Sequence, residues 1–230
     1  MNRSSTPPAS RSSASASPAS ASGSSSADPS SSPTRAARWI AVAAGLCCLA
    51  SLYGFGAALD GYSQRLHPPG LLGARGIDHA AAFNLLGFAL PGLAMAWVGW
   101  RLRERLDQRS RATRIGAWMW SLSALAWAAQ GAFVLDPANL DAQFSRLHAA
   151  MWLLWALAFV AGALLVGLDA VRRPAERGLA LIAWLAAAAM VIVLRDGQFG
   201  LMSGPVAQRL ALCAWLVAYV AMMWREHKQR

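Results

Sequence analysis

Polar side chains that could bind a ligand or move a proton gather at matching ends of several long apolar runs. Histidine and aspartate can act as general acids or bases or as metal ligands, and side-chain amides can orient a bound group. Polar groups inside a membrane are costly and usually face a cavity or the bundle interior. We call the following set the outer polar cluster: Asp78, His79, Asn84, Asp136, His148, Gln208 and Arg209.

The outer polar cluster allows three interpretations. First, it could line a funnel that binds a lipid or small ligand or assists transport. Second, His79 and His148 could bind a metal together with an aspartate, although no HExxH motif or comparable pair is present. Third, the residues could simply cap helices, because Asp78 resembles an N-cap and Asp136-Pro137 resembles a helix end.

The alternative to a binding protein is a membrane-embedded, metal-dependent hydrolase. His79, His148 and nearby aspartates would then form its acid–base group. Neither Ser51 nor Ser203 lies in a recognisable nucleophile motif. The sequence therefore favours a non-enzymatic role, assigns no catalytic residue and no metal ligand, and indicates no cofactor.

Six long apolar runs must position these side chains. Of the 230 residues, 56% are hydrophobic and 14% charged, whereas about a quarter of a soluble domain is charged. A spanning helix needs roughly 20 apolar residues, and in lipid such a run can satisfy its backbone only as a helix. We expect an all-α fold, a bundle of six transmembrane helices within residues 36–226. The expected spans are 38–59, 79–100, 115–135, 147–168, 178–194 and 210–224.

Residues 1–35 form a different kind of segment, rich in serine, alanine and proline. Such a composition cannot bury enough apolar surface to offset chain entropy, so we expect a disordered cytoplasmic tail. The tail lacks the apolar core of a signal peptide, and the first apolar run is longer than a signal core. We expect that run to be retained as an anchor.

The arginines predict an orientation. Sixteen of the 21 Lys and Arg residues fall on the side of both termini and five on the other side. Cytoplasmic loops carry this excess, so both termini should be cytoplasmic. The 20 arginines against one lysine, together with abundant alanine, indicate a GC-rich bacterial genome and hence the cell inner membrane. The net charge of +10 lies in connectors rather than on one face, which favours the lipid bilayer over nucleic acid as partner.

Details inside the runs indicate packing rather than chemistry. Pro91 should kink the second run, because proline lacks the N–H that a helix interior needs. Cys47, Cys48 and Cys213 all fall inside expected spans. Buried cysteines usually behave as small hydrophobic residues, and these spacings suggest no disulfide or metal framework.

Three stretches carry a resemblance to a known family. They are 71–92 (LLGARGIDHAAAFNLLGFALPG), 131–148 (GAFVLDPANLDAQFSRLH) and 204–210 (GPVAQRL). Over roughly residues 40–224 the chain resembles the DUF998 family of uncharacterised polytopic membrane proteins. Departures include Pro91 and Gly204-Pro205. The resemblance implies about six transmembrane helices and no agreed activity. It highlights Asn84, Asp136, His148, Gln208 and Arg209.

Overall fold

The computed structural model describes residues 32–106, 109–199 and 203–225, and every regular element in these ranges is a helix. Five helices are long and apolar enough to cross a membrane. The chain is thus a multi-pass membrane protein, as its composition predicts. The five candidate spans are Arg35–Ala58, Ala80–Glu104, Gln143–Ala170, Pro174–Arg195 and Gly204–Trp224.

Helices overlap all six predicted runs. Three elements, α2, η2 and α3, follow one another without a break and together form the helix of the second run. Two short 3₁₀ helices, η1 and η3, lie in connectors. The bounds are α1 Ser32–Ala58, η1 Pro69–Gly73, α2 Ala80–Phe83, η2 Asn84–Ala89, α3 Leu90–Arg105, α4 Arg111–Gln130, α5 Gln143–Ala170, η3 Pro174–Glu176, α6 Arg177–Phe199 and α7 Gly204–Arg225.

Several predicted boundaries are displaced. Helix α1 already begins at Ser32, inside the predicted tail, and the rest of that tail lies outside the described residues. Helix α4 ends at Gln130, five residues before the predicted end at 135. Helix α7 begins at Gly204, six residues before the predicted start at 210. At α1 and α7, hydrogen bonding carries the helix into polar flanks beyond the apolar stretch that hydropathy marks. Helix α4 instead stops at its C-cap Gly131, where the chain turns although the next residues are still apolar.

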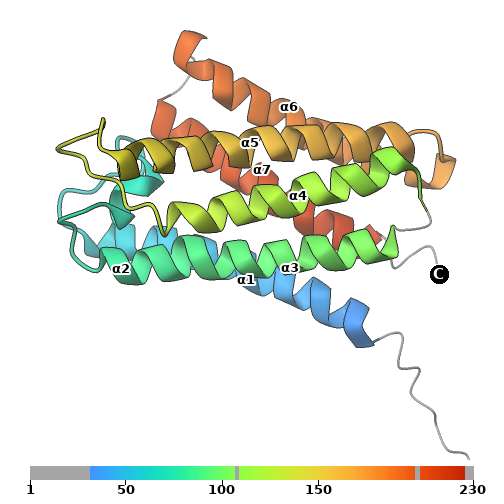
Figure 1. Cartoon of the computed structure of the whole chain (residues 1–230), viewed down its shortest axis with the longest axis horizontal. Helices are drawn as coiled ribbons and strands as arrows, with labels where there is room; N and C mark the ends of the chain where they lie inside the picture. Colours follow the sequence, from blue (N-terminus) through green and yellow to red (C-terminus); the bar gives the residue numbers. More distant parts are fainter. Residues whose placement is uncertain (1–31, 107–108, 200–202, 226–230) are drawn as a thin grey trace, which may run out of the picture.

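Helix α4 is the run that does not reach the apolarity of a candidate span. Its tryptophans, serines and terminal glutamine lower the mean hydropathy, although the helix is 20 residues long. It packs against both α3 and α5 (Figure 1). The contact with α5 is close, because a Cβ on Gly162 would lie 2.7 Å from the carbonyl oxygen of Gly116. Small residues permit such approach between membrane helices.

The long helices lie side by side along one axis (Figure 1). The described start of α1 and the described end of α7 lie at the same end of the bundle. The connectors 59–79 and 131–142 lie at the opposite end, which we call the loop end. Helix α6 packs against α5 and α7 but diverges from α5 toward its own C-terminus (Figure 1).

A π-helical segment precedes Pro91. Proline cannot donate a hydrogen bond to a carbonyl four or five residues back, which are those of Gly87 and Leu86. Other side chains reach both carbonyls: the Cys47 thiol lies 3.4 Å from the Leu86 oxygen, and the Cys48 thiol lies 3.4 Å from the Gly87 oxygen. The indole of Trp127 also donates to the Gly87 oxygen at 3.1 Å. The predicted kink is therefore a π segment whose carbonyls are satisfied by α1 and α4.

Buried aromatic rings form the core between α4, α5 and α7. Trp127 lies 5.0 Å from Trp155 and 5.7 Å from Trp215, measured between ring centroids. Tyr219 lies 5.0 Å from the ring of Trp120 and donates its hydroxyl to the carbonyl of that residue. Such rings bury large apolar areas and interact through their edges and faces.

Candidate functional site

A pocket of about 260 Å³ opens at the loop end, between the outer parts of α5 and α7. Residues from four helices and two connectors contribute to it, and none of them is charged. No described residue of α6 lines it. Ligand pockets are usually mostly apolar, with a few placed polar groups, and this pocket has that composition. Its lining consists of Pro68, Pro69, Gly70, Phe88, Trp127, Gln130, Leu135, His148, Ala149, Trp152 and Gln208.

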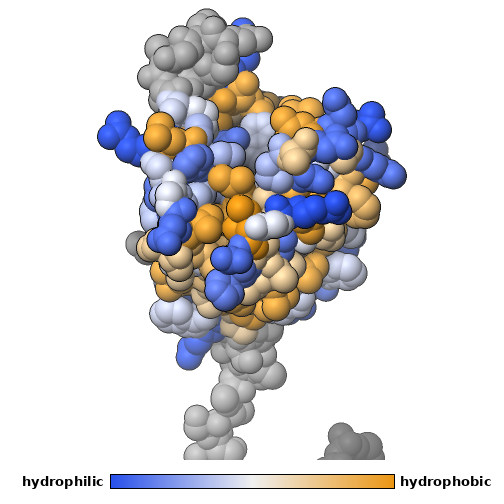
Figure 2. Space-filling model, turned by 90° about the vertical axis from the view of Figure 1, so that its left-hand side faces the viewer, coloured by the Kyte–Doolittle hydropathy of each residue, from blue (hydrophilic) through white to orange (hydrophobic). Residues whose placement is uncertain are grey.

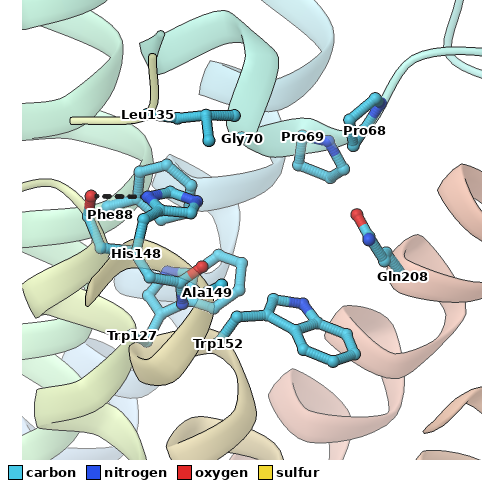
Figure 3. Close-up of a pocket in the computed structure, with 11 residues that line it drawn as sticks. Pro68, Pro69, Gly70, Phe88, Trp127, Leu135, His148, Ala149, Trp152 and Gln208 are labelled. Atoms are coloured by element: carbon cyan, nitrogen blue, oxygen red, sulfur yellow. Dashed lines mark hydrogen bonds between the residues drawn. The ribbon is translucent and has the colours of Figure 1, made fainter. Parts of the chain in front are cut away.

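Figure 3 shows how the walls face one another. His148 and Trp152 project from α5, and Gln208 faces them from α7. Pro68 and Pro69 close the cavity on the side of η1. The ring planes differ in direction, so the cavity offers both ring faces and ring edges to a bound group.

The aromatic wall is continuous with the core. The ring of Phe88 lies 5.0 Å from that of Trp127 and 5.9 Å from that of His148. Phe88 belongs to the π segment, which makes the phenyl ring part of this wall. π segments occur frequently at functional sites, because the additional residue changes the direction of nearby side chains.

His148 is held in one tautomer. Its Nδ1 lies 2.9 Å from the carbonyl oxygen of Phe133 and 3.2 Å from that of Gln130. Carbonyls only accept, so Nδ1 must carry a proton. In the neutral imidazole, Nε2 is then a hydrogen-bond acceptor. This atom lies beside Gly70, where an added Cβ would be 2.9 Å away.

Two glutamines supply amides to the same cavity. Gln130 is 1% exposed, and its amide nitrogen has no hydrogen-bond partner in the part of the chain that the structure describes. An unpaired buried donor costs roughly 1–3 kcal/mol. The indole N–H groups of Trp155 and Trp215 also lack a partner among the described residues, but only Gln130 of these three lines the pocket. Gln208 is half-buried on the opposite side. The pocket therefore combines an acceptor, an unpaired donor and a second amide.

Arg209 of α7 binds the connector segment 62–68, which lines the pocket at Pro68 and which we call the roof. Its guanidinium donates to Gln64 Oε1 at 2.7 and 2.9 Å and to the Tyr62 hydroxyl at 2.7 Å. The Tyr62 hydroxyl in turn lies 3.3 Å from the carbonyl oxygen of Pro68, which lines the cavity. A further donation from Arg209 reaches the Pro205 carbonyl at 2.8 Å. These contacts hold the 62–68 connector against the start of α7.

The guanidinium of Arg209 is buried at the roof, and the groups to which it donates are neutral. Arg209 is 8% exposed, and among the described residues no carboxylate lies within ion-pair distance of it. Burial raises the pKa of the Tyr62 phenol, and the Arg209 guanidinium acts in the opposite direction. Tyr62 therefore stays a neutral hydroxyl that both accepts from Arg209 and donates to a backbone carbonyl.

The outer polar cluster is only partly assembled. His148 and Gln208 line the pocket, and Arg209 holds its roof. Asn84 is buried beside it and donates to the carbonyl of Gly73 at 2.9 Å. Asp136 lies apart: its carboxylate is 3.4 Å from Arg75.

Two predicted members take no part in the pocket. Asp78 and His79 are exposed in the turn before α2. The expectation that Asp78 is the N-cap is wrong, because the cap residue is His79, in the left-handed region at φ 60° without a side-chain cap bond. The chain turns sharply after Gly76, so the first helical residue comes later than the pattern suggests.

The contacts of His148 bear on the hydrolase hypothesis. Its Nδ1 faces backbone carbonyls rather than an aspartate. The described ranges also contain no group of three or more His, Cys, Asp or Glu side chains able to hold a metal ion. The contacts of His148 thus include neither His79 nor Asp136, the partners that the hydrolase hypothesis would give it.

Several residues of the site were not anticipated. Phe88, Trp127 and Trp152 look like ordinary lipid-facing or core aromatics in the sequence, because apolar runs contain many of them. Tyr62 and Gln64 lie in a connector without a motif. Gln130 is the exception: the sequence does predict that it faces the bundle interior or a cavity, since a glutamine within an apolar run is costly elsewhere.

The surface of the loop end combines hydrophobic and hydrophilic residues. Figure 2 looks onto this end and shows hydrophobic residues exposed between hydrophilic ones. Leu66 and Leu140, in the connectors, and Phe144, in the first turn of α5, are among the exposed apolar side chains at this end. Such a surface suits the interface between the hydrocarbon layer and water.

Comparisons with family models, with curated proteins and with solved structures found no match for this chain. The resemblance to the DUF998 family therefore stays a prediction from the motifs.

Proposed function

We propose that this chain binds a lipid or another small apolar ligand in the pocket between α5 and α7. The observation that carries the proposal is Gln130: a buried amide nitrogen without a hydrogen-bond partner among the described residues, on a residue that lines a mainly apolar cavity. A bound group that accepts this hydrogen bond would remove the cost of the unpaired donor. The position of the pocket near an apolar helix surface favours a ligand that partitions into the bilayer.

Access from the side supports a lipid-soluble ligand. Ala149 is exposed and Trp152 is half-buried, so the cavity reaches the surface of α5. No described residue of α6 lines the cavity, and α6 diverges from α5 toward the loop end (Figure 1). We infer entry between α5 and α7, from the membrane rather than through the roof.

The proposal includes six spans in a bacterial inner membrane, with both termini cytoplasmic. Helix α4 is the proposed sixth span, and its place between α3 and α5 supports this (Figure 1). An even number of spans also agrees with the described start of α1 and end of α7 lying at one end. The arginine excess of 16 to five on that side supports its cytoplasmic assignment.

A pair of neighbouring substitutions tests the binding function. Ala149→Phe places a large ring in the cavity, whereas Ala150→Phe adds the same ring on an exposed position outside the lining. Naphthalene serves as the apolar probe in detergent micelles, followed by calorimetry. We expect binding by the wild type and by Ala150→Phe and loss of at least tenfold in affinity for Ala149→Phe. Equal heats for all three proteins, reflecting micelle partition alone, would refute the proposal.

A further inference from the structure

We infer that the ligand is a neutral ring compound carrying a hydroxyl group, of the size of one or two fused rings. This inference rests on the proposed binding function and specifies its ligand class. Three features of the pocket lead to it: its size, its lack of charge, and the chemical character of two polar groups, His148 Nε2 and the Gln130 amide.

Size sets the scale of the ring. An engineered apolar cavity of about 150 Å³ binds benzene. The present pocket is larger, at about 260 Å³. Phe88, Trp127 and Trp152 surround it with aromatic rings that suit a flat partner. A long flexible chain would lose more conformational freedom in such a space than a rigid ring does.

The lining favours a ligand without charge. No lining residue carries a charge, and a carboxylate or phosphate transferred into an apolar site without a counter-ion is strongly disfavoured. The nearby cation, Arg209, does not line the pocket. Its guanidinium is directed to Gln64, Tyr62 and the Pro205 carbonyl instead.

The polar atoms select a hydroxyl. His148 presents Nε2 as an acceptor, because the two carbonyls fix the proton on Nδ1. The Gln130 amide nitrogen has no partner among the residues that the structure describes, and rotation about the last torsion of its side chain can direct that group to the cavity. A hydroxyl oxygen can satisfy both: its O–H donates to His148 Nε2, and its lone pair accepts from Gln130. A ketone or ether could only accept, which would leave Nε2 without a donor.

The experiment compares three probes that share one ring system. They are 2-naphthol, naphthalene and 2-naphthoate, titrated into the full-length protein in detergent micelles. The two hydrogen bonds of the hydroxyl, net of its desolvation, should make 2-naphthol bind about tenfold more tightly than naphthalene, a difference of about 1.4 kcal/mol, and 2-naphthoate should bind most weakly. Equal affinity of naphthol and naphthalene, or preference for naphthoate, would overturn the inference while leaving the binding function intact.

Two variants assign the effect to the polar atoms. Gln130→Leu removes the donor and His148→Phe removes the acceptor, and each should reduce the preference for naphthol over naphthalene to less than threefold. Because His148→Phe also removes the bonds to two carbonyls, Gly70→Ala serves as a second test of Nε2 that keeps the histidine side chain. A tenfold preference that persists in all three variants would contradict the assignment.

The source of the natural ligand can be identified in the same material. Organic extraction of protein purified from membranes, compared with the Ala149→Phe variant, should yield a ring alcohol that only the open pocket retains. A ring with a long hydrocarbon tail would identify the bilayer as its source, and a ring without one would identify the aqueous phase. Retention of only acyl phospholipids, equally by both proteins, would count against the inferred class.

Discussion

The imidazole of His148 and the backbone of Gly70 lie so close that a Cβ added at residue 70 would be 2.9 Å from Nε2. The two residues come from different parts of the chain, α5 and the short η1 helix. Their proximity joins the wall of the pocket to its roof. It also means that the smallest possible side chain at residue 70 would cover the acceptor atom of the site.

The first prediction concerns Gly70→Ala. The methyl group should block Nε2 or displace the ring, so the affinity for 2-naphthol should fall about tenfold, toward that for naphthalene. Titration calorimetry measures the change. Gly54→Ala is the matched control, because its Cβ would meet nothing within 4 Å, and it should bind as the wild type does. An unchanged naphthol affinity in Gly70→Ala would show that Nε2 does not contact the ligand.

The second prediction concerns Arg209, which fastens the roof to α7. Arg209→Met leaves Gln64 and Tyr62 without their donor, and should lower the free energy of unfolding by about 1–3 kcal/mol. Arg209→Lys keeps the charge but not the fork of donors, so its effect should be intermediate. Hydrogen exchange should become faster in the 62–70 connector. Arg65→Met, at an exposed position, serves as the control.

A stability of Arg209→Lys equal to that of the wild type would contradict this role. The charge alone would then suffice, and the hydrogen bonds to Gln64 and Tyr62 would contribute nothing measurable. Thermal unfolding in one detergent at constant pH separates these outcomes.

The third prediction concerns the π segment. Trp127→Phe removes the N–H that donates to Gly87, and should cost about 1–2 kcal/mol of stability. Pro91→Ala restores a backbone N–H that can reach the same carbonyl. The cost of Trp127→Phe should therefore be smaller in the Pro91→Ala background, with a coupling energy of at least about 0.5 kcal/mol.

A double-mutant cycle in detergent measures that coupling. The smaller ring at residue 127 leaves a cavity in both backgrounds, so this contribution cancels in the cycle. Equal costs in the two backgrounds would show that the indole does not compensate for the proline.

Much of the helical architecture could be predicted, because a long apolar run in lipid has few conformations open to it. The contacts of the site could not. Pro91 predicts a distortion but not that Phe88 would line a pocket as a result. His148 was selected because it lies at the outer end of a helix, whereas Asp78 was selected by the same criterion and lies exposed. Gln208 was selected only through the family resemblance. Helix ends share a level in the membrane, but only packing decides which of them face one another.

The final prediction concerns α4 and the number of spans. A reporter fused after Gln108 should be cytoplasmic, and one fused after Asn139 should be external. The pair is informative because α4, Arg111–Gln130, is the long helix between the two positions. A phosphatase active only outside the inner membrane and a fluorescent protein active only in the cytoplasm give opposite signals at each position. If both fusions report the same side, α4 does not cross the membrane. If they report opposite sides in reversed order, six spans stand and the arginine-based orientation is wrong.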